Sequence, residues 1–138
     1  MYASRAVPAV DQEELLAILK KSKANNPKAG VTGVLCFCTS AHIFLQVLEG
    51  GRNAVSALYN EISQDPRHHD VALLSYEEIG ERSFSHWSMG QVNMSRLNPA
   101  LVLKYSENTQ LDPYAVSGQA SLALFNELVA TASIGVQV

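Results

Sequence analysis

Gln46 is a polar residue within an apolar stretch of the chain, Ile43 to Gly50. The stretch is rich in strand-forming residues and ends in two glycines, a pattern that predicts a β-strand. Side chains alternate along a strand, so Gln46 shares one face with Phe44 and Leu48. A buried amide needs hydrogen-bond partners, and it offers both donors and an acceptor. Gln46 is therefore suited to bind the polar edge of a ligand, or it is a core residue satisfied by the backbone.

The first predicted helix, residues 11–26, changes from apolar to polar along its inward face. That face ends with Ser22 and Asn26, and Asn25 lies beside them. The two asparagines could simply end the helix, but Ser22 one turn earlier favours a ligand. A planar polar molecule between this helix and the Gln46 strand would form hydrogen bonds with the three amides.

Arg67, His68 and Tyr2 are further candidates for the same site. Arg67 and His68 follow the second predicted helix, where they could reach an anionic or carbonyl edge or lie in a solvated loop. We expect Tyr2 beside Gln46 if their strands are neighbours. A tyrosine next to an amide at a ligand could relay a proton and an electron, whereas a core tyrosine would bind any available acceptor.

Trp87 and Met89 alternate on the last predicted strand and share one face. They are either core residues or neighbours of the ligand that exchange places when its surroundings change. The pattern does not decide which of the two points inward.

The order of elements predicts an α+β fold, a ferredoxin-like sheet (β-α-β-β-α-β-β) with two helices on one face. We expect strands at residues 2–4, 31–38, 43–49, 71–79 and 87–92, and helices at 11–26, 52–64, 98–106 and 116–131. The strand at 31–38 is apolar on both faces, so its second face must also be covered. The last two helices would form that cap, on the same sheet or at a subunit interface. We therefore divide the chain into a domain at 1–95 and an extension at 96–138.

The composition describes an ordinary soluble domain: 138 residues, 47% apolar and 17% charged, with a net charge of −3. Nothing in the charge pattern points to nucleic acid. No stretch approaches the ~20 apolar residues of a membrane span, and no signal peptide is visible, so we expect a cytoplasmic protein. Cys36 and Cys38 are expected to be buried thiols, because side chains two apart on a strand are roughly 7 Å apart. The four histidines have no metal-ligand spacing.

Four segments together resemble the BLUF family, blue-light sensors that bind flavin. They occur in the family's order, and the resemblance covers residues 2–92. The segments are Asn25 to Leu35, Phe44 to Gly50, Asp65 to His68 and Trp87 to Met89. The sequence departs from the family's pattern in two places. The family has a few apolar residues before the tyrosine, where this sequence has only Met1, and the turn at 38–42 is slightly long.

The resemblance implies FAD, held non-covalently between the two helices. Tyr2 would give an electron and a proton to the excited flavin, and Gln46 would bridge Tyr2 and the N5/O4 edge. After recombination Gln46 would keep a new rotamer or tautomer. The strand of Trp87 and Met89 would pass this change to the tail. By the same resemblance, the other cofactor-binding residues are Asn26 at the O4/N3 edge, Asn25, Arg67 and His68 at the pyrimidine and ribityl side, and Ser22 in the pocket wall.

The implied function is a stand-alone photoreceptor and not an enzyme. We expect it to signal to an unknown partner protein or through its own assembly, as a homo-oligomer, because no output domain follows the sensor. One alternative is a small hydrolase of the acylphosphatase type that would use Arg5, although no glycine-rich phosphate cradle surrounds it. The other is a binding or scaffold domain without chemistry.

Overall fold

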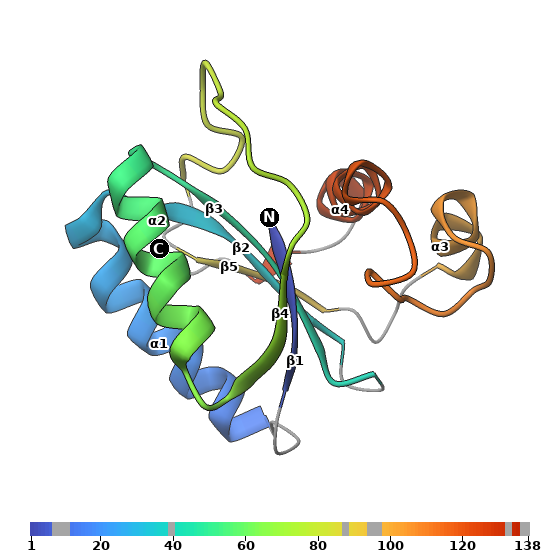
Figure 1. Cartoon of the computed structure of the whole chain (residues 1–138), viewed down its shortest axis with the longest axis horizontal. Coiled ribbons are helices and arrows are strands. Elements are labelled where there is room, and N and C mark those ends of the chain that lie inside the picture. The colour runs from blue at the N-terminus through green and yellow to red at the C-terminus, as the bar shows by residue number, and fades with distance from the viewer. Residues whose placement is uncertain (7–11, 39–40, 87–88, 94–97, 132–133, 136–138) are drawn as a thin grey trace.

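A computed structural model describes residues 1–6, 12–38, 41–86, 89–93, 98–131 and 134–135 (Figure 1). The strands are β1 (Tyr2–Ala6), β2 (Thr32–Cys38), β3 (Ile43–Glu49), β4 (His68–Leu73), β5 (Gly90–Asn93) and β6 (Ile134–Gly135). The helices are α1 (Gln12–Ala29), α2 (Arg52–Gln64), α3 (Pro99–Tyr105) and α4 (Gly118–Thr131).

The strands form one sheet in the order β4-β1-β3-β2-β5-β6. The first four strands are antiparallel neighbours in the ferredoxin-like order, and β5 extends the sheet parallel to β2. The predicted α+β class and the additional strand are therefore confirmed. The short β6, which pairs antiparallel with β5, was not predicted.

Helices cover both faces of the sheet. Helices α1 and α2 lie on one face, and α4 lies on the other, with α3 beyond it (Figure 1). Phe125 of α4 is fully buried in a cluster with Val34, Cys36 and Leu45, which point away from α1 and α2. Helix α4 thus covers the second apolar face of β2, as its sequence requires, whereas α3 packs against α4. Cys36 and Cys38 are buried free thiols, as predicted.

Helix α1 continues three residues beyond its predicted end at Asn26. Pro27 lies in the last turn, where a proline costs one backbone hydrogen bond without ending the helix. The helix ends instead at Gly30, which has a φ of 71°. The Val31 N–H donates to the Asn26 carbonyl (2.9 Å) and the Gly30 N–H to the Pro27 carbonyl (3.2 Å), the two bonds of a Schellman cap.

Strand β4 differs most from its prediction, because it spans His68–Leu73 and not residues 71–79. Its partner is β1, and their last paired residues are Tyr2 and Leu73. The segment that follows has a strand-like sequence but no strand beside it, so the ladder stops. The predicted strand at 87–92 is observed as β5 at Gly90–Asn93, and residues 87–88 lie outside the described part.

Candidate functional site

Tyr2 and Gln46 lie directly opposite each other on β1 and β3. The Tyr2 hydroxyl donates a hydrogen bond to Oε1 of Gln46, and both side chains are buried. Burial raises the pKa of Tyr2, and the nearby Tyr59 and Asp65 raise it further. Tyr2 is therefore a neutral donor across the ordinary pH range, and the predicted tyrosine–amide pair is present.

Met89 contacts the nitrogen end of the Gln46 amide. Because Oε1 accepts from Tyr2, Nε2 points away from it and donates to the Met89 sulfur at 3.1 Å. Met89 is fully buried, just before β5. A thioether is a weak acceptor, so a stronger acceptor would compete well for this N–H. Met89 thus points inward to the Gln46 amide, while Trp87 lies outside the described residues.

The polar residues of α1 differ in exposure. Asn26 is only 4% exposed, Ser22 is half-buried and Asn25 is exposed. Successive helical residues are 100° apart, so two adjacent asparagines cannot share one direction. Asn26 is therefore the amide that α1 presents to the interior.

His68 is placed against the same face of the sheet. Its Nδ1 lies 2.7 Å from the Ser4 hydroxyl, and its ring lies 4.8 Å from the ring of Phe44. Burial is the main cause that lowers the pKa of His68. Ser4 was not predicted as a site residue, although it shares a face of β1 with Tyr2 and the alternation of strand residues could have indicated it.

Arg67 is fixed at the end of α2 by Asp65. Its Nε and Nη2 contact the carboxylate at 3.0 Å and 2.6 Å. The hydrogen bonds from Arg67 are the main reason that the pKa of Asp65 falls to about 2. This pairing holds the guanidinium in one place at the start of β4 and offsets its charge.

Arg5, which the hydrolase alternative would need, is engaged elsewhere. Its Nε lies 3.5 Å from the Asp70 carboxylate, and its guanidinium lies over the Tyr114 ring at 4.3 Å. Tyr114 also donates to the Asp70 carbonyl (2.7 Å). Arg5 therefore fastens the segment before α4 to the edge of the sheet, and it does not resemble a phosphate-binding arginine.

An apolar surface lies between α1 and the sheet, with the polar groups of Asn26 and Gln46 near it. The buried apolar residues of this cluster are Ala6, Leu19, Leu35, Phe37, Phe44 and Met89, with Ile18 and Leu48 packed against them. A flat molecule with apolar faces and a polar edge suits such a surface.

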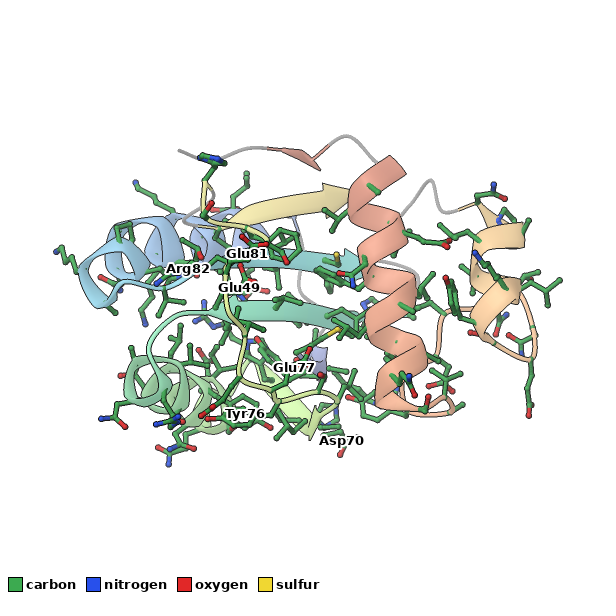
Figure 2. The ribbon with its side chains drawn as sticks, turned by 90° about the horizontal axis from the view of Figure 1, so that it is seen from above. Glu49, Asp70, Tyr76, Glu77, Glu81 and Arg82 are labelled. Atoms are coloured by element: carbon green, nitrogen blue, oxygen red, sulfur yellow. The ribbon has the colours of Figure 1, made fainter. Side chains whose placement is uncertain are left out.

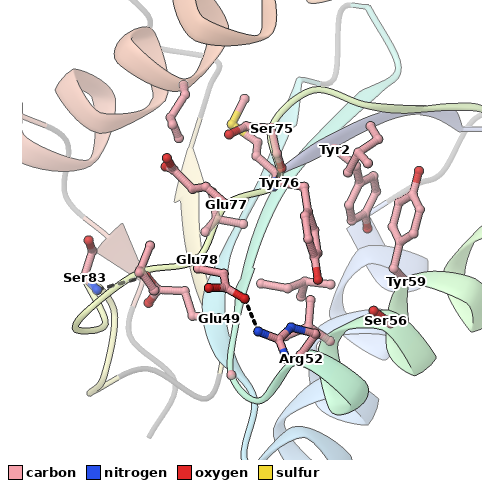
Figure 3. Close-up of a pocket in the computed structure, with 18 of the residues that line it drawn as sticks. Tyr2, Glu49, Arg52, Ser56, Tyr59, Ser75, Tyr76, Glu77, Glu78 and Ser83 are labelled. Carbon is pink, nitrogen blue, oxygen red and sulfur yellow. Dashed lines mark hydrogen bonds and ion pairs between the residues drawn. The ribbon is translucent and has the colours of Figure 1, made fainter.

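A cavity of about 780 Å³ lies beside this site, between α2, the end of β3 and the segment after β4 (Figure 3). Tyr2 is the one residue of the predicted site that lines it, among those the structure describes. Tyr59 of α2 also lines it, and its ring centroid lies 5.6 Å from that of Tyr2. Neither the cavity nor the Tyr2–Tyr59 pair was predicted from the sequence.

Among the described residues, no three His, Cys, Asp or Glu side chains are grouped as a metal ion would require. In the same ranges no helix has the length and apolar character needed to cross a membrane.

Comparison with known proteins agrees with this geometry. Residues 1–90 match the profile of the BLUF family, described as sensors of blue-light using FAD. The chain belongs to this family, and its cofactor is FAD.

Three relatives illustrate the similarity. Photoactivated adenylate cyclase subunit beta from Euglena longa is 34% identical over 89 residues, which is 64% of this chain and 10% of that protein. The chain thus spans about a tenth of the length of the first curated relatives it matches. The structure called BlsA photo-activated state has a TM-score of 0.83 at 30% identity, covering 96% of this chain and 94% of that one. BlrB, a BLUF protein in its dark state, has a TM-score of 0.76 at 31% identity, with coverage of 94% and 91%.

The residues near α1 fit FAD. The flavin ring has broad apolar faces and one edge that carries both donors and acceptors. The amides of Asn26 and Gln46 can complement such an edge because each offers two N–H donors and a carbonyl. Both are buried beside the apolar cluster that would contact the ring faces.

Proposed function

We propose that this chain senses blue light through a relay of Tyr2, Gln46 and Met89. The observation that carries the proposal is the continuous hydrogen-bond chain from the Tyr2 hydroxyl through the Gln46 amide to the Met89 sulfur. All three side chains are buried, so water does not compete for these bonds.

Bound FAD would supply the absorption of blue light and an acceptor for one electron. Tyr2 would be the donor of that electron, and its hydroxyl would pass its proton to Oε1 of Gln46. Tyr2 would recover both the electron and the proton, so the cycle would have no net redox change. Gln46 would remain in a new rotamer or tautomer, with its N–H turned from Met89 toward a stronger acceptor. Few alternative partners exist in the buried site, so the new arrangement persists.

The remaining polar residues would hold the cofactor. Asn26 is the strongest candidate for the ring edge because its amide is buried. Asn25, Arg67 and His68 would contact the pyrimidine and ribityl side, and Ser22 would line the pocket.

Met89 would carry the signal from the relay to the C-terminal extension. It directly precedes β5, and β5 pairs with β6, which follows α4. A change in the packing of Met89 would shift the backbone of β5 and therefore of β6. Trp87, on the same segment, would take part in this step.

At the scale of the protein, we propose a cytoplasmic sensor without enzymatic turnover. Residues 1–95 would sense light, and 96–138 would transmit the change to a signalling protein or within a homo-oligomer. The name photoactivated adenylate cyclase assigns a light-controlled output to that relative, which supports such coupling without identifying the output here.

The test is an absorption spectrum of the purified protein in darkness and after a blue pulse. We expect a flavin spectrum that shifts slightly to the red and reverts in darkness. A flavin spectrum that never shifts would contradict the relay while leaving the cofactor in place.

A further inference from the structure

Glu49 is a buried carboxyl group at the end of the strand that carries Gln46. It is only 7% exposed. Its two oxygens accept one hydrogen bond each, from the N–H groups of Ser83 (2.9 Å) and Phe84 (2.8 Å) (Figure 3). A buried polar group needs such partners, and here both belong to the segment between β4 and β5. Glu49 therefore fastens that segment to β3.

The residue before this pair is fastened to the neighbouring strand. Arg82 donates to the Gly30 carbonyl (2.7 Å) and to the Thr32 hydroxyl (3.1 Å). Thr32 begins β2 and is the direct partner of Glu49 in the sheet, and Figure 2 shows Glu49 and Arg82 at the same end of the molecule. We call residues 82–84 the loop anchor. Arg82 is exposed, so its bonds should hold the loop anchor less firmly than the buried bonds of Glu49 do.

Phe84 is also held through its side chain. It is 6% exposed, and its ring contacts that of Phe125 in α4 edge to face, with the centroids 6.1 Å apart. Such aromatic pairs have a preferred geometry, so Phe84 cannot move along the sheet without losing this contact. Glu49 thus fixes the backbone of Phe84, and α4 fixes its ring.

The loop anchor lies shortly before Met89 in the chain. Residues 85–88 separate Phe84 from Met89. If residues 82–84 were free, the connection to Met89 would begin after Leu73, where β4 ends. A longer connection leaves its ends more conformations. The hydrogen bonds of Glu49 therefore shorten the connection that brings Met89 to the sheet.

The direction of the Met89 side chain depends on the register of β5. This strand has four residues and pairs with β2 so that Gly90 lies opposite Val34. A slip of one residue turns each side chain of a strand to the other face, and Met89 would then leave the Gln46 amide. A strand of this length forms few bonds that could fix its own register. The loop anchor restricts such a slip from the N-terminal side of Met89.

We propose that Glu49 is a positioning residue of the relay. By holding Ser83 and Phe84, it would set the register of β5 and keep the Met89 sulfur at the Gln46 amide. This role rests on the proposed function, in which the Gln46 N–H turns away from Met89. Glu49 would act from the opposite face of β3, because side chains three positions apart on a strand point to opposite faces.

The test is NMR spectroscopy of the full chain with bound FAD, in darkness, with isotope-labelled methionine methyl groups. The sequence has three methionines, and the signal that Met89→Leu removes belongs to Met89. We expect Glu49→Ala to move the Met89 signal. Glu49→Gln keeps the shape and one acceptor oxygen, so it should move the signal less. A Met89 signal that stays in place in every folded Glu49 variant would overturn the proposal.

Val102→Ala separates positioning from a general loss of stability. Val102 is fully buried in α3, beyond α4 (Figure 1), so its truncation should also destabilise the fold. We expect the Met89 signal to keep its position in Val102→Ala and in Glu81→Ala, which alters an exposed residue beside the loop anchor. Equal movement in Val102→Ala and Glu49→Ala would overturn the proposal, because Glu49 would then act through stability alone.

A double-mutant cycle on the rate of dark recovery tests the same role in the photocycle. Residues that act through each other are not additive, so we expect Glu49→Ala to change the rate about threefold or more, but less than about 1.5-fold when Met89→Leu is present. Equal changes in both backgrounds would overturn the proposal. A protein without any red shift would contradict the relay, and the Met89 signal in darkness would still decide whether Glu49 positions Met89.

Discussion

The photochemistry that we propose depends on one amide with two different partners. Gln46 accepts from Tyr2 at one end and donates to Met89 at the other. Reversal of the amide would place an N–H against a neutral hydroxyl and a carbonyl against a thioether, which donates no hydrogen bond. The two arrangements are therefore unequal in energy, and a light-driven change needs a new acceptor, such as a flavin edge, to persist.

Gln46→Leu and Tyr2→Phe test this relay directly. The first removes both hydrogen bonds of the amide, and the second removes the hydroxyl that donates the proton. We expect both variants to retain FAD, because Asn26 and the apolar cluster are unchanged, and to lose the red shift after a blue pulse. Absorption spectroscopy measures both properties. A normal, reversible shift in either variant would show that the relay is wrong.

Asn26→Ala should weaken cofactor binding without removing the relay. The loss of a buried amide partner costs about 1–3 kcal/mol, or roughly 5- to 150-fold in the dissociation constant of FAD. Titration of the FAD-free protein measures it. Asn25→Ala should have a smaller effect, because Asn25 is exposed, and Lys20→Ala on the exposed side of α1 should have none. Unchanged affinity in Asn26→Ala would remove Asn26 from the site.

His68 should make the fold sensitive to mild acid. Burial lowers its pKa in the folded protein, against the influence of Asp65 and together with that of Arg67. The unfolded chain therefore binds a proton at a higher pH than the folded chain does. The free energy of unfolding should fall as pH decreases below about 6.5, the ordinary value for histidine, and level off below the folded pKa.

Urea denaturation between about pH 7.5 and about pH 5.5 measures this dependence. His68→Asn should reduce the slope of stability against pH, whereas the exposed His69→Asn should retain it. The same slope in all three proteins would show that His68 does not titrate on unfolding.

At the scale of the elements, the sequence predicted the ends of a helix or strand correctly where residues close in the chain determine those ends. The Gln46 strand and the second helix have their predicted ends, because Gly50 and Gly51 separate them and Asp65-Pro66 stops the helix. The prediction for α1 was wrong at Pro27, because a Schellman cap at Gly30 outweighs one missing bond.

Other features required the assembled structure. The end of β4 depends on how far β1 extends, which no local pattern in residues 71–79 contains. Tyr2 and Gln46 could be predicted as neighbours from the order of strands. The contact of Gln46 with Met89 could not, because it depends on where the chain crosses beside β2 to reach β5. The spacing of the helix had placed Asn26 on the inward face and Asn25 beside it, but only the structure shows that Asn26 is buried and Asn25 is exposed.

Glu49 connects two elements, and its loss should be measurable. Its buried carboxylate accepts the N–H groups of Ser83 and Phe84, so Glu49→Ala leaves both donors without this partner. We expect a loss of about 1.5–3 kcal/mol in the free energy of unfolding, measured by urea denaturation. Glu81→Ala, an exposed residue of the same loop, should change stability by less than about 0.5 kcal/mol. Equal values for the two variants would contradict the role of Glu49.

At the scale of the whole molecule, Tyr2 connects the proposed relay with the cavity beside α2. Its hydroxyl donates to Gln46, and its residue lines the cavity next to Tyr59. The apolar cluster near α1 and the cavity near α2 therefore share Tyr2 as a neighbour. If light changes the position or hydrogen bonding of Tyr2, as we propose, it also changes one wall of this cavity.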